Sequence, residues 1–191
     1  MFRMLLVPAI VAIAAAQLVP FEQDDRWGYK TRQGKVVIAP RYQIAGRFSN
    51  GIAAVCCDSG WAYIDATGRV VIRPLPYDNG PDPFQEGVAR FTAGGKVGFC
   101  DRRGRIVIPA KFDWAGQFSQ GRAVVCEDCR PVQEGEHTLQ KGGRWGYIDR
   151  TGAIAIPLKF ESAVDFEKGR ARVKAGGVWK DIDRTGRILN R

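Results

Sequence analysis

Apolar residues in this chain form short runs of about four to six positions, bounded by glycine, proline or aspartate. Beyond the first twenty residues, no run keeps a helical spacing of apolar side chains for more than about one turn. The runs are rich in valine, isoleucine and aromatic residues, which are enriched in strands. The pattern predicts an all-β protein built from short antiparallel strands.

One run recurs five times along the chain. It is most complete as Trp-Gly-Tyr-Ile-Asp at residues 145–149, and altered copies lie at 27–29, 61–65, 97–101 and 179–183. The first residues of successive copies are 34, 36, 48 and 34 positions apart. A period of this size is typical of one small unit stacked on copies of itself. The sequence therefore predicts a repeat domain over residues 17–191, with repeat cores starting near residues 27, 61, 97, 145 and 179.

Each copy contains three predicted strands. The first follows a Phe-x-x-Gly signal, the second is the Trp-Gly-Tyr element, and the third is a Val/Ile run that reaches a proline such as Pro157. We expect the proline to end the third strand, because it has no amide to donate. The Asp-x-x-Gly segment between the second and third strands is typical of a tight turn. The segment has a superficial likeness to the Asp-Thr-Gly motif of aspartic proteases, but we interpret it as a turn, because turn chemistry explains every residue of it.

One three-stranded unit cannot bury both of its faces, so the units must cover one another. We expect an open, solenoid-like stack of about five three-stranded antiparallel β-meanders, and a closed five-bladed propeller is the alternative. The glycine after tryptophan, as at Gly146, should allow close approach by an adjacent unit. In the fifth copy, Lys180 and Asp181 replace glycine and tyrosine. At least one of them should be exposed as a polar cap.

The motif Trp-Gly-Tyr-Ile-Asp-x-x-Gly-x-x-x-Ile-Pro, followed by Phe-x-x-Gly-x-Ala, resembles the bacterial WG-containing repeat, also called the KWG repeat. The resemblance covers about residues 27–191. Ala62 in place of glycine and Val97 in place of tryptophan depart from the pattern. The resemblance implies a repeat module of largely uncharacterised function, with no catalytic residues to carry over.

The first sixteen residues have the pattern of a secretory signal peptide. Arg3 precedes an apolar run that ends in Ala14-Ala15-Ala16, so we expect cleavage near Ala16. The run is shorter than the roughly 20 apolar residues of a membrane-spanning helix, and no transmembrane segment is expected after cleavage. The sequence thus predicts a periplasmic or secreted protein.

The charge of the chain bears on its partner. The net charge is +9, and residues 141–191 hold 12 basic against 6 acidic residues. On an exported protein, such a surface favours a protein or an anionic envelope glycan or lipid as partner, and export argues against nucleic acid. A solvated surface that aids solubility is the bland alternative. The sequence does not predict an oligomeric state.

The repeat is interrupted most strongly before its fourth core, where 14 residues are added within an inserted loop, 126–143. Loops of repeat arrays often carry function, so the candidate binding residues are Cys126, Cys129, Arg130, His137 and Lys141. An idle surface loop is equally consistent with the insertion. In an exported protein a Cys126–Cys129 disulfide is favoured over a metal site completed by His137. Beyond it we expect a mobile loop around residues 134–136.

Catalytic patterns are poor in this chain. The sequence has one histidine, and it shows neither a phosphate-binding glycine loop nor a His-Glu-x-x-His motif. We therefore expect a non-enzymatic exported module, with no catalytic residues, no metal ligands and no cofactor. An exported carboxylate-dependent hydrolase of envelope polymer, or a Cys/His-based redox or metal-handling protein, are the alternatives. Cys100 takes the isoleucine position of its repeat and should be a buried core residue.

Overall fold

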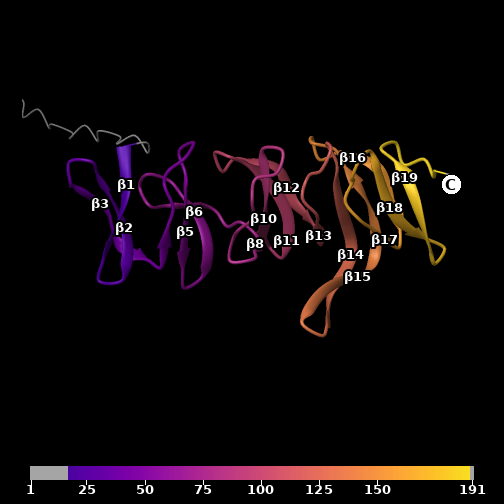
Figure 1. The fold of residues 1–191 in the computed structure, drawn as a ribbon, viewed down its shortest axis with the longest axis horizontal. Coiled ribbons are helices and arrows are strands. Elements are labelled where there is room, and N and C mark those ends of the chain that lie inside the picture. The colour runs from indigo at the N-terminus through magenta and orange to yellow at the C-terminus, as the bar shows by residue number, and fades with distance from the viewer. Residues whose placement is uncertain (1–16, 190–191) are drawn as a thin grey trace, which may run out of the picture.

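The computed structural model describes residues 17–189, and the predicted signal peptide lies outside them. Five small antiparallel sheets of three or four strands follow one another in chain order and form an open row (Figure 1). The first and last sheets lie at opposite ends of the row, so the predicted open stack is confirmed and the chain does not close into a propeller. Within the described residues, no helix has the length and hydropathy needed to span a bilayer.

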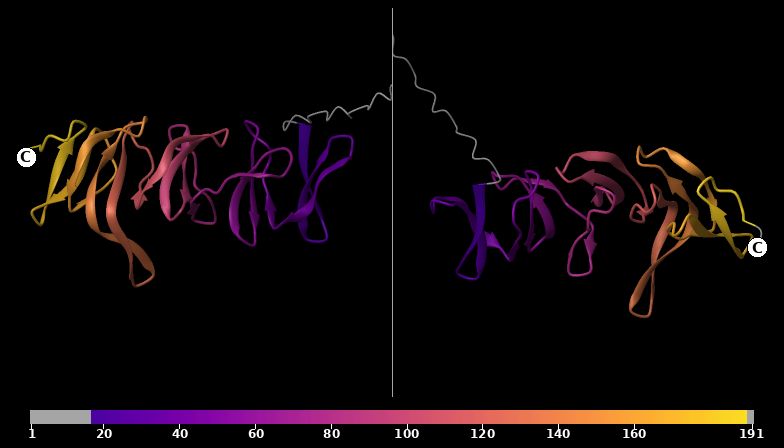
Figure 2. Two further views of the ribbon diagram at one scale, coloured as in Figure 1. Left: turned by 180° about the vertical axis from the view of Figure 1, so that it is seen from behind. Right: turned by 45° about the horizontal axis from the view of Figure 1, so that its top comes forward.

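The five sheets are called units 1 to 5 here, and two further views of the row are given in Figure 2. Between units 2 and 3 stands a small hairpin of β8 (Pro76–Tyr77) and β9 (Gly80–Pro81). In chain order the units contain β1 (Leu18–Gln23), β2 (Arg26–Thr31) and β3 (Val36–Tyr42); β4 (Ile44–Ala45), β5 (Ala53–Cys57), β6 (Gly60–Ile64) and β7 (Val70–Ile72); β10 (Val88–Ala93), β11 (Lys96–Asp101) and β12 (Ile106–Phe112); β13 (Trp114–Ala115), β14 (Ala123–Glu134), β15 (His137–Ile148) and β16 (Ile154–Phe160); β17 (Ser162–Ala163), β18 (Arg170–Ala175) and β19 (Val178–Asp183).

The third strands connect the units to one another. β3, β12 and β16 each leave their own sheet and continue, after one residue, as β4, β13 and β17. These short strands pair with the first long strand of the next unit. At these three of the four junctions, one continuous stretch of chain therefore belongs to two sheets, which fixes the distance and direction from one unit to the next.

The glycine after tryptophan lies beneath a bulge in the third strand of its own sheet. In unit 4, Trp145 pairs with Phe160 and Tyr147 pairs with Ile156, so three residues of β15 oppose five of β16. A Cβ atom on Gly146 would lie 2.6 Å from the carbonyl oxygen of Ile156. The expectation of close approach by an adjacent unit was therefore wrong, because the neighbouring strand of the same sheet fills that space.

The proline of the third strand belongs to the same bulge. β3, β12 and β16 run past Pro40, Pro109 and Pro157 to an aromatic residue that pairs again with the second strand. The prediction that proline ends these strands was wrong. A bulge is one of the few places where a strand tolerates a residue without an amide, so the glycine and the proline form one local structure.

The Asp-x-x-Gly turns are confirmed as structural. Asp149 Oδ1 accepts hydrogen bonds from the hydroxyl and the amide of Thr151, at 2.6 and 2.8 Å. These two bonds, the hydroxyl first, hold the pKa of Asp149 below its usual range. Gly152 takes a φ of 83°, which a residue with a side chain adopts only under strain.

The turn glycines also provide the close approach between units. A Cβ on Gly152 would lie 2.9 Å from the side chain of Ile108 in unit 3. The equivalent glycines of units 2, 3 and 5 face Ile38, Val71 and Ile156 of the preceding unit in the same way. Each turn therefore rests on an aliphatic side chain of the unit before it.

Aromatic side chains fill the space between the sheets. The phenylalanine of each Phe-x-x-Gly signal packs on the aromatic residue of the preceding second strand, with ring centroids 4.8–5.6 Å apart at the four junctions. In the best example, Phe166 packs edge-on against Tyr147, which is fully buried and donates a 2.7 Å hydrogen bond to the carbonyl of Val164. The core is therefore divided into layers between successive units.

The two polar residues of the last unit are less exposed than predicted. Lys180 and Asp181 are both half-buried, so the prediction that at least one is exposed was wrong. The chain returns after β19 and forms a bridge between Ile182 and Ile188, while Arg172 of β18 lies 3.9 Å from the Asp181 carboxylate. These neighbours cover much of the two polar side chains.

Candidate functional site

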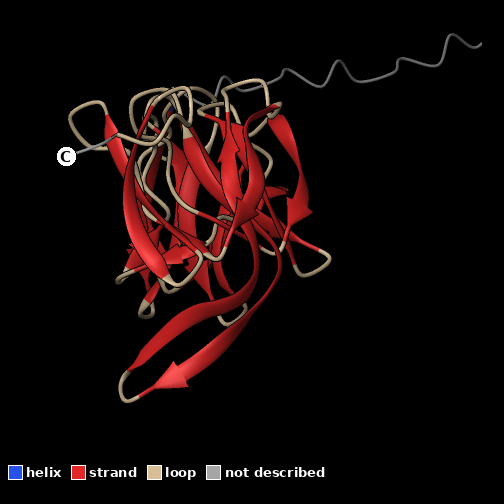
Figure 3. Ribbon diagram, turned by 90° about the vertical axis from the view of Figure 1, so that its right-hand side faces the viewer, coloured by secondary structure: helices blue, strands red, loops and turns tan. Residues whose placement is uncertain are grey.

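The insertion before the fourth repeat core forms a long two-stranded ribbon. β14 and β15 pair from Ala123–Ile148 out to Glu134–His137, and the outer part, which we call the ribbon (residues 127–144), projects from the row (Figures 1 and 3). The chain reverses at Gly135, whose φ of 61° suits the first position of a type II′ turn. The expectation of an irregular loop was therefore wrong, because strand pairing continues to the tip.

A disulfide lies where the ribbon leaves the sheet. Cys126 and Cys129, both on β14, are joined, with their Cα atoms 6.1 Å apart. Between them the chain bends at Asp128, which has a φ of 63°. Cys56 and Cys57 remain free thiols in unit 2. The structure thus has the predicted pairing, and the ribbon does not fold back onto unit 2.

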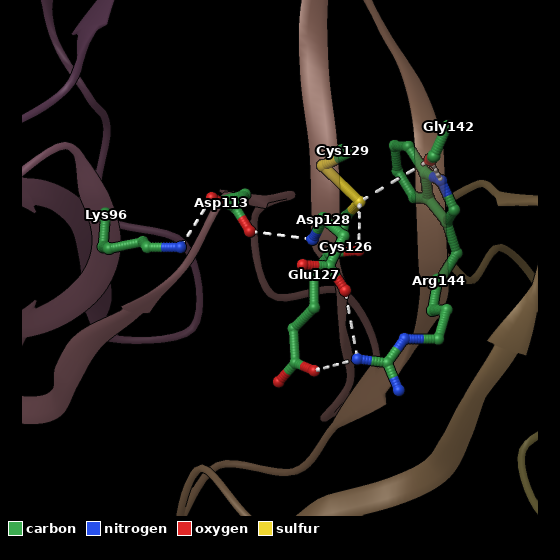
Figure 4. The surroundings of a disulfide bond; sticks show 9 residues. Lys96, Asp113, Cys126, Glu127, Asp128, Cys129, Gly142 and Arg144 are labelled. Atoms are coloured by element: carbon green, nitrogen blue, oxygen red, sulfur yellow. Dashed lines mark hydrogen bonds and ion pairs between the residues drawn. A yellow bond between two sulfur atoms is a disulfide. The ribbon is translucent and has the colours of Figure 1, made fainter.

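The base of the ribbon is also held by charged side chains (Figure 4). Asp113 receives a 2.6 Å bond from Lys96 and a 2.8 Å bond from the amide of Asp128. The bond from Lys96 contributes most to holding the pKa of Asp113 below its usual range. On the other side, Arg144 donates to the carboxylates of Glu127 and Asp128, at 3.3 and 3.1 Å. These contacts tie the ribbon to unit 3 and its two strands to each other.

The predicted site residues are distributed along the ribbon. Arg130 and Lys141 are partners in its register, and Lys141 is ion-paired with Glu134. His137 lies at the tip, five residue pairs beyond Cys129, or about 16 Å at the usual rise of a strand. The structure therefore does not bring His137 to the two cysteines. Across residues 17–189, no three His, Cys, Asp or Glu side chains are grouped as metal ligands would be.

A groove separates the ribbon from unit 5. It is lined by Leu139, Gln140, Lys141 and Gly142 of the ribbon and by Glu161, Ser162, Lys174 and Trp179. Two large apolar side chains in it are open to solvent, Leu139 at 44 % and Trp179 at 42 % exposure. Trp179 is the tryptophan of the fifth copy.

The groove combines an aromatic surface with basic side chains. The Arg172 guanidinium lies 5.3 Å from the centre of the Trp179 ring, and Lys141 and Lys174 line the same space. The Glu161 carboxylate is occupied by the amide of Gly177, at 3.0 Å. Such a surface suits a flat or apolar group that carries negative charge. The sequence analysis missed Trp179 and Lys174, because the groove forms between segments that only the fold brings together. The only indication in the sequence was the tryptophan of the fifth copy.

The cysteines make a testable contrast. Burial raises the pKa of Cys100 to about 11, and its side chain is fully covered as predicted. The Ser59 hydroxyl, 3.2 Å from the Cys57 sulfur, holds the pKa of Cys57 below its usual range. Because the thiolate is the reactive form, iodoacetamide should modify Cys57 first and spare Cys100 in the folded protein. Peptide mass spectrometry over time measures this order.

Two controls complete the thiol experiment. Cys57→Ser should remove the fastest modification, and unfolding without a reductant should expose Cys100 while Cys126 and Cys129 stay protected. Modification of Cys100 at the rate of Cys57 in the native protein would contradict the burial described here.

Comparison with protein families identifies the repeat. A family model described as "WG containing repeat" matches the chain four times, at residues 27–61, 61–96, 98–128 and 145–179. Together these segments cover well over half of the chain, and the gap after residue 128 coincides with the ribbon. No curated protein matches the chain.

Proposed function

Since the chain belongs to the WG containing repeat family, we propose that it is a non-enzymatic binding module, exported by the signal peptide predicted at residues 1–16. Its partner is a protein or an anionic glycan or lipid of the cell envelope. The ribbon and the groove beside it make the contact. Cleavage near Ala16 would leave β1 complete, and Leu18 at its start is buried in the core.

The observation that carries the proposal is the construction of the ribbon. A two-stranded ribbon without a sheet to cover it has little stability of its own in water. Here its base is fixed by the disulfide, by Arg144 and by the link through Asp113 to unit 3. The outer strands bury few side chains, so these supports add little to the core of the repeats. They do hold a projecting surface in a defined position, which a binding surface requires.

The charge of the groove favours an anionic group on the partner. The side chains of Lys141, Lys174 and Arg172 surround Trp179, while the carboxylate of Glu161 is directed to a backbone amide. Aromatic and arginine side chains in a recess are the residues that most often anchor a partner. Leu139 extends the apolar surface across to the ribbon.

The proposal is tested by replacing residues 130–141 with an Asn-Gly turn. Cys129 and Gly142 are register partners, so a two-residue turn can join them without disturbing the disulfide. Capture of the partner from envelope extracts should be lost, and the melting temperature should change little because the removed side chains are mostly exposed. Protease treatment of the extract distinguishes a protein partner from a glycan or lipid.

Two exposed aromatic residues provide a matched pair. Trp179→Ala in the groove should weaken capture strongly. Tyr77→Ala should leave capture unchanged, because β8 lies between units 2 and 3, away from the groove. Tyr77 is a suitable control because its exposure, 51 %, is similar to the 42 % of Trp179. Full capture by the shortened ribbon would remove the ribbon from the site. Full capture by the Trp179 variant would remove the groove.

A further inference from the structure

An aliphatic stripe runs along the edge of the row that carries the Asp-x-x-Gly turns, called the turn edge here. The residue that follows each five-residue turn segment is valine or isoleucine in all five units. In units 1 to 4 it begins the third strand, and in unit 5 it is Ile188, which forms an isolated bridge with Ile182. Each of these side chains is 41–57 % exposed: Val36, Val70, Ile106, Ile154 and Ile188. Val71 and Val107 add two further exposed side chains beside them. Single exposed apolar residues are ordinary, but a series repeated in every unit is not.

The topology places this series on one edge. The turn glycine of each of units 2 to 5 packs on an aliphatic residue of the unit before it, so successive turns follow one another along the row. The ribbon extends the connection between the first and second strands of unit 4, which lies at the other end of the antiparallel strands. The turn edge and the edge from which the ribbon projects are therefore opposite edges of the row (Figure 1). With sheets about 10 Å apart, five units give a stripe of about 40 Å.

Basic residues accompany the stripe. The residue directly before the exposed aliphatic one is Lys35, Arg69, Arg105 or Arg187 in four of the five units. The five turn segments, 31–35, 65–69, 101–105, 149–153 and 183–187, together hold nine basic and four acidic residues. The four acidic residues are the turn aspartates, each with Oδ1 bonded to backbone amides of its own turn, and Asp101 Oδ2 is also ion-paired with Arg105. The connections on the opposite edge, 23–26, 57–60, 93–96, 126–145 and 175–178, hold five basic and seven acidic residues.

We propose that the turn edge binds the surface of an anionic lipid bilayer. The exposed valine and isoleucine side chains enter the interface between headgroups, and the neighbouring lysine and arginine side chains contact lipid phosphates. Apolar side chains flanked by basic ones are the pattern of interfacial binding to an anionic membrane. A water-soluble anionic glycan would account for the basic residues, but it gives no reason for an aliphatic residue at the same place in every unit. This surface is separate from the ribbon and the groove, so its failure would leave the function proposed above unaffected.

The test uses the full chain and sedimentation with vesicles of phosphatidylcholine, with and without phosphatidylglycerol. The parent protein should bind the mixed vesicles much more strongly, and added salt should weaken that binding. Changing Lys35, Arg69 and Arg187 to glutamine should weaken it about a hundredfold, since each basic residue at an anionic surface contributes about fivefold. The matched control changes Arg26, Arg73 and Lys96 to glutamine. These residues lie at connections on the opposite edge and outside the groove, as shown by the contacts of Arg26 with Asp58 and of Arg73 with Ser59. The control has the same net charge and should retain most of the binding.

A second set of variants separates a bilayer from a soluble polyanion. Val36, Val70 and Ile106 are changed to threonine, which keeps strand propensity and removes apolar surface. Vesicle binding should fall at least tenfold, while the control Ile44, Val164 and Val178 to threonine should have little effect, because those exposed residues lie elsewhere. Circular dichroism confirms that each variant is folded. Equal binding to both kinds of vesicle would overturn the proposal. Loss of binding in the basic variants but not in the stripe variants would also overturn it, in favour of a soluble anionic polymer.

Discussion

Replacement of Gly146 by alanine should destabilise the protein by about 3 kcal/mol, at the upper end of the cost of overpacking a well-filled site. The added Cβ would meet the carbonyl oxygen of Ile156 at 2.6 Å and the amide nitrogen of Leu158 at 2.8 Å. Both are backbone atoms of the bulge, so they cannot rotate away as a flexible side chain would. Relief requires β16 to move and the pairing between Trp145 and Phe160 to weaken. Urea titration of the two proteins gives the difference in the free energy of unfolding.

Unit 2 supplies the natural control. There β7 ends at Ile72, and its register contains only Tyr63–Ile72 and Ile64–Val70, so no bulge lies over Ala62. Ala62→Gly should therefore cost less than about 1 kcal/mol, the usual effect of glycine in a strand. Gly98→Ala in unit 3 should behave like Gly146→Ala, because its Cβ would meet the same atoms of β12. A mild effect at both glycines would mean that the bulge is not what excludes a side chain.

Replacement of Asp82 by alanine should cost about 3–5 kcal/mol, the usual penalty for breaking a buried ion pair. Asp82 is fully buried and Arg90 is only 8 % exposed. The Asp82 carboxylate accepts bonds from the amide and the guanidinium of Arg90, at 2.7 and 2.6 Å, and from the side chain of Gln117. Without it, the Arg90 guanidinium keeps the carbonyl of Ala115 but loses its counter-charge.

A double-mutant cycle isolates the pair. For the cycle, Asp82 is changed to asparagine and Arg90 to methionine. Arg90→Met should reduce the free energy of unfolding at least as much as Asp82→Asn, because it leaves a buried carboxylate without its partner. The double variant should recover part of the loss. Glu167→Gln, which touches only the exposed 4.0 Å pair with Lys168, should cause no measurable change. Strictly additive losses in the Asp82 and Arg90 variants would show that the two charges do not depend on each other.

Much of the fold could be predicted from the sequence because its signals are local. Strand composition, the Asp-x-x-Gly turns and the repeat period depend on neighbouring residues, and so does the disulfide between Cys126 and Cys129. The partner of Gly146 could not be predicted, because it depends on the register between two strands. β1 was also missed as a strand, since Leu18–Gln23 has no Phe-x-x-Gly signal before it and contains Pro20.

The ribbon was misinterpreted for a related reason. Its glycine pair at 142–143 and Pro131 favour a loop when read along the chain. The pairing of Val132 with Leu139 and of Gln133 with Thr138 becomes visible only across the two strands. The residues that line the groove are still further apart in the sequence. The binding residues predicted from the insertion therefore included Lys141 but not Trp179, which lies across the groove from it.

The four junctions between units are built from the same two contacts, a turn glycine on an aliphatic side chain and a phenylalanine on an aromatic one. A duplicated unit would therefore meet neighbours that already fit it. Copy number can change in whole steps, each adding about 10 Å of edge and preserving the junctions on either side. Because contacts presented on one rigid body act together, each added copy multiplies the strength of attachment to an extended surface. If the turn edge binds a membrane as proposed, the gain or loss of a whole repeat would therefore change the strength of attachment without altering a single contact residue.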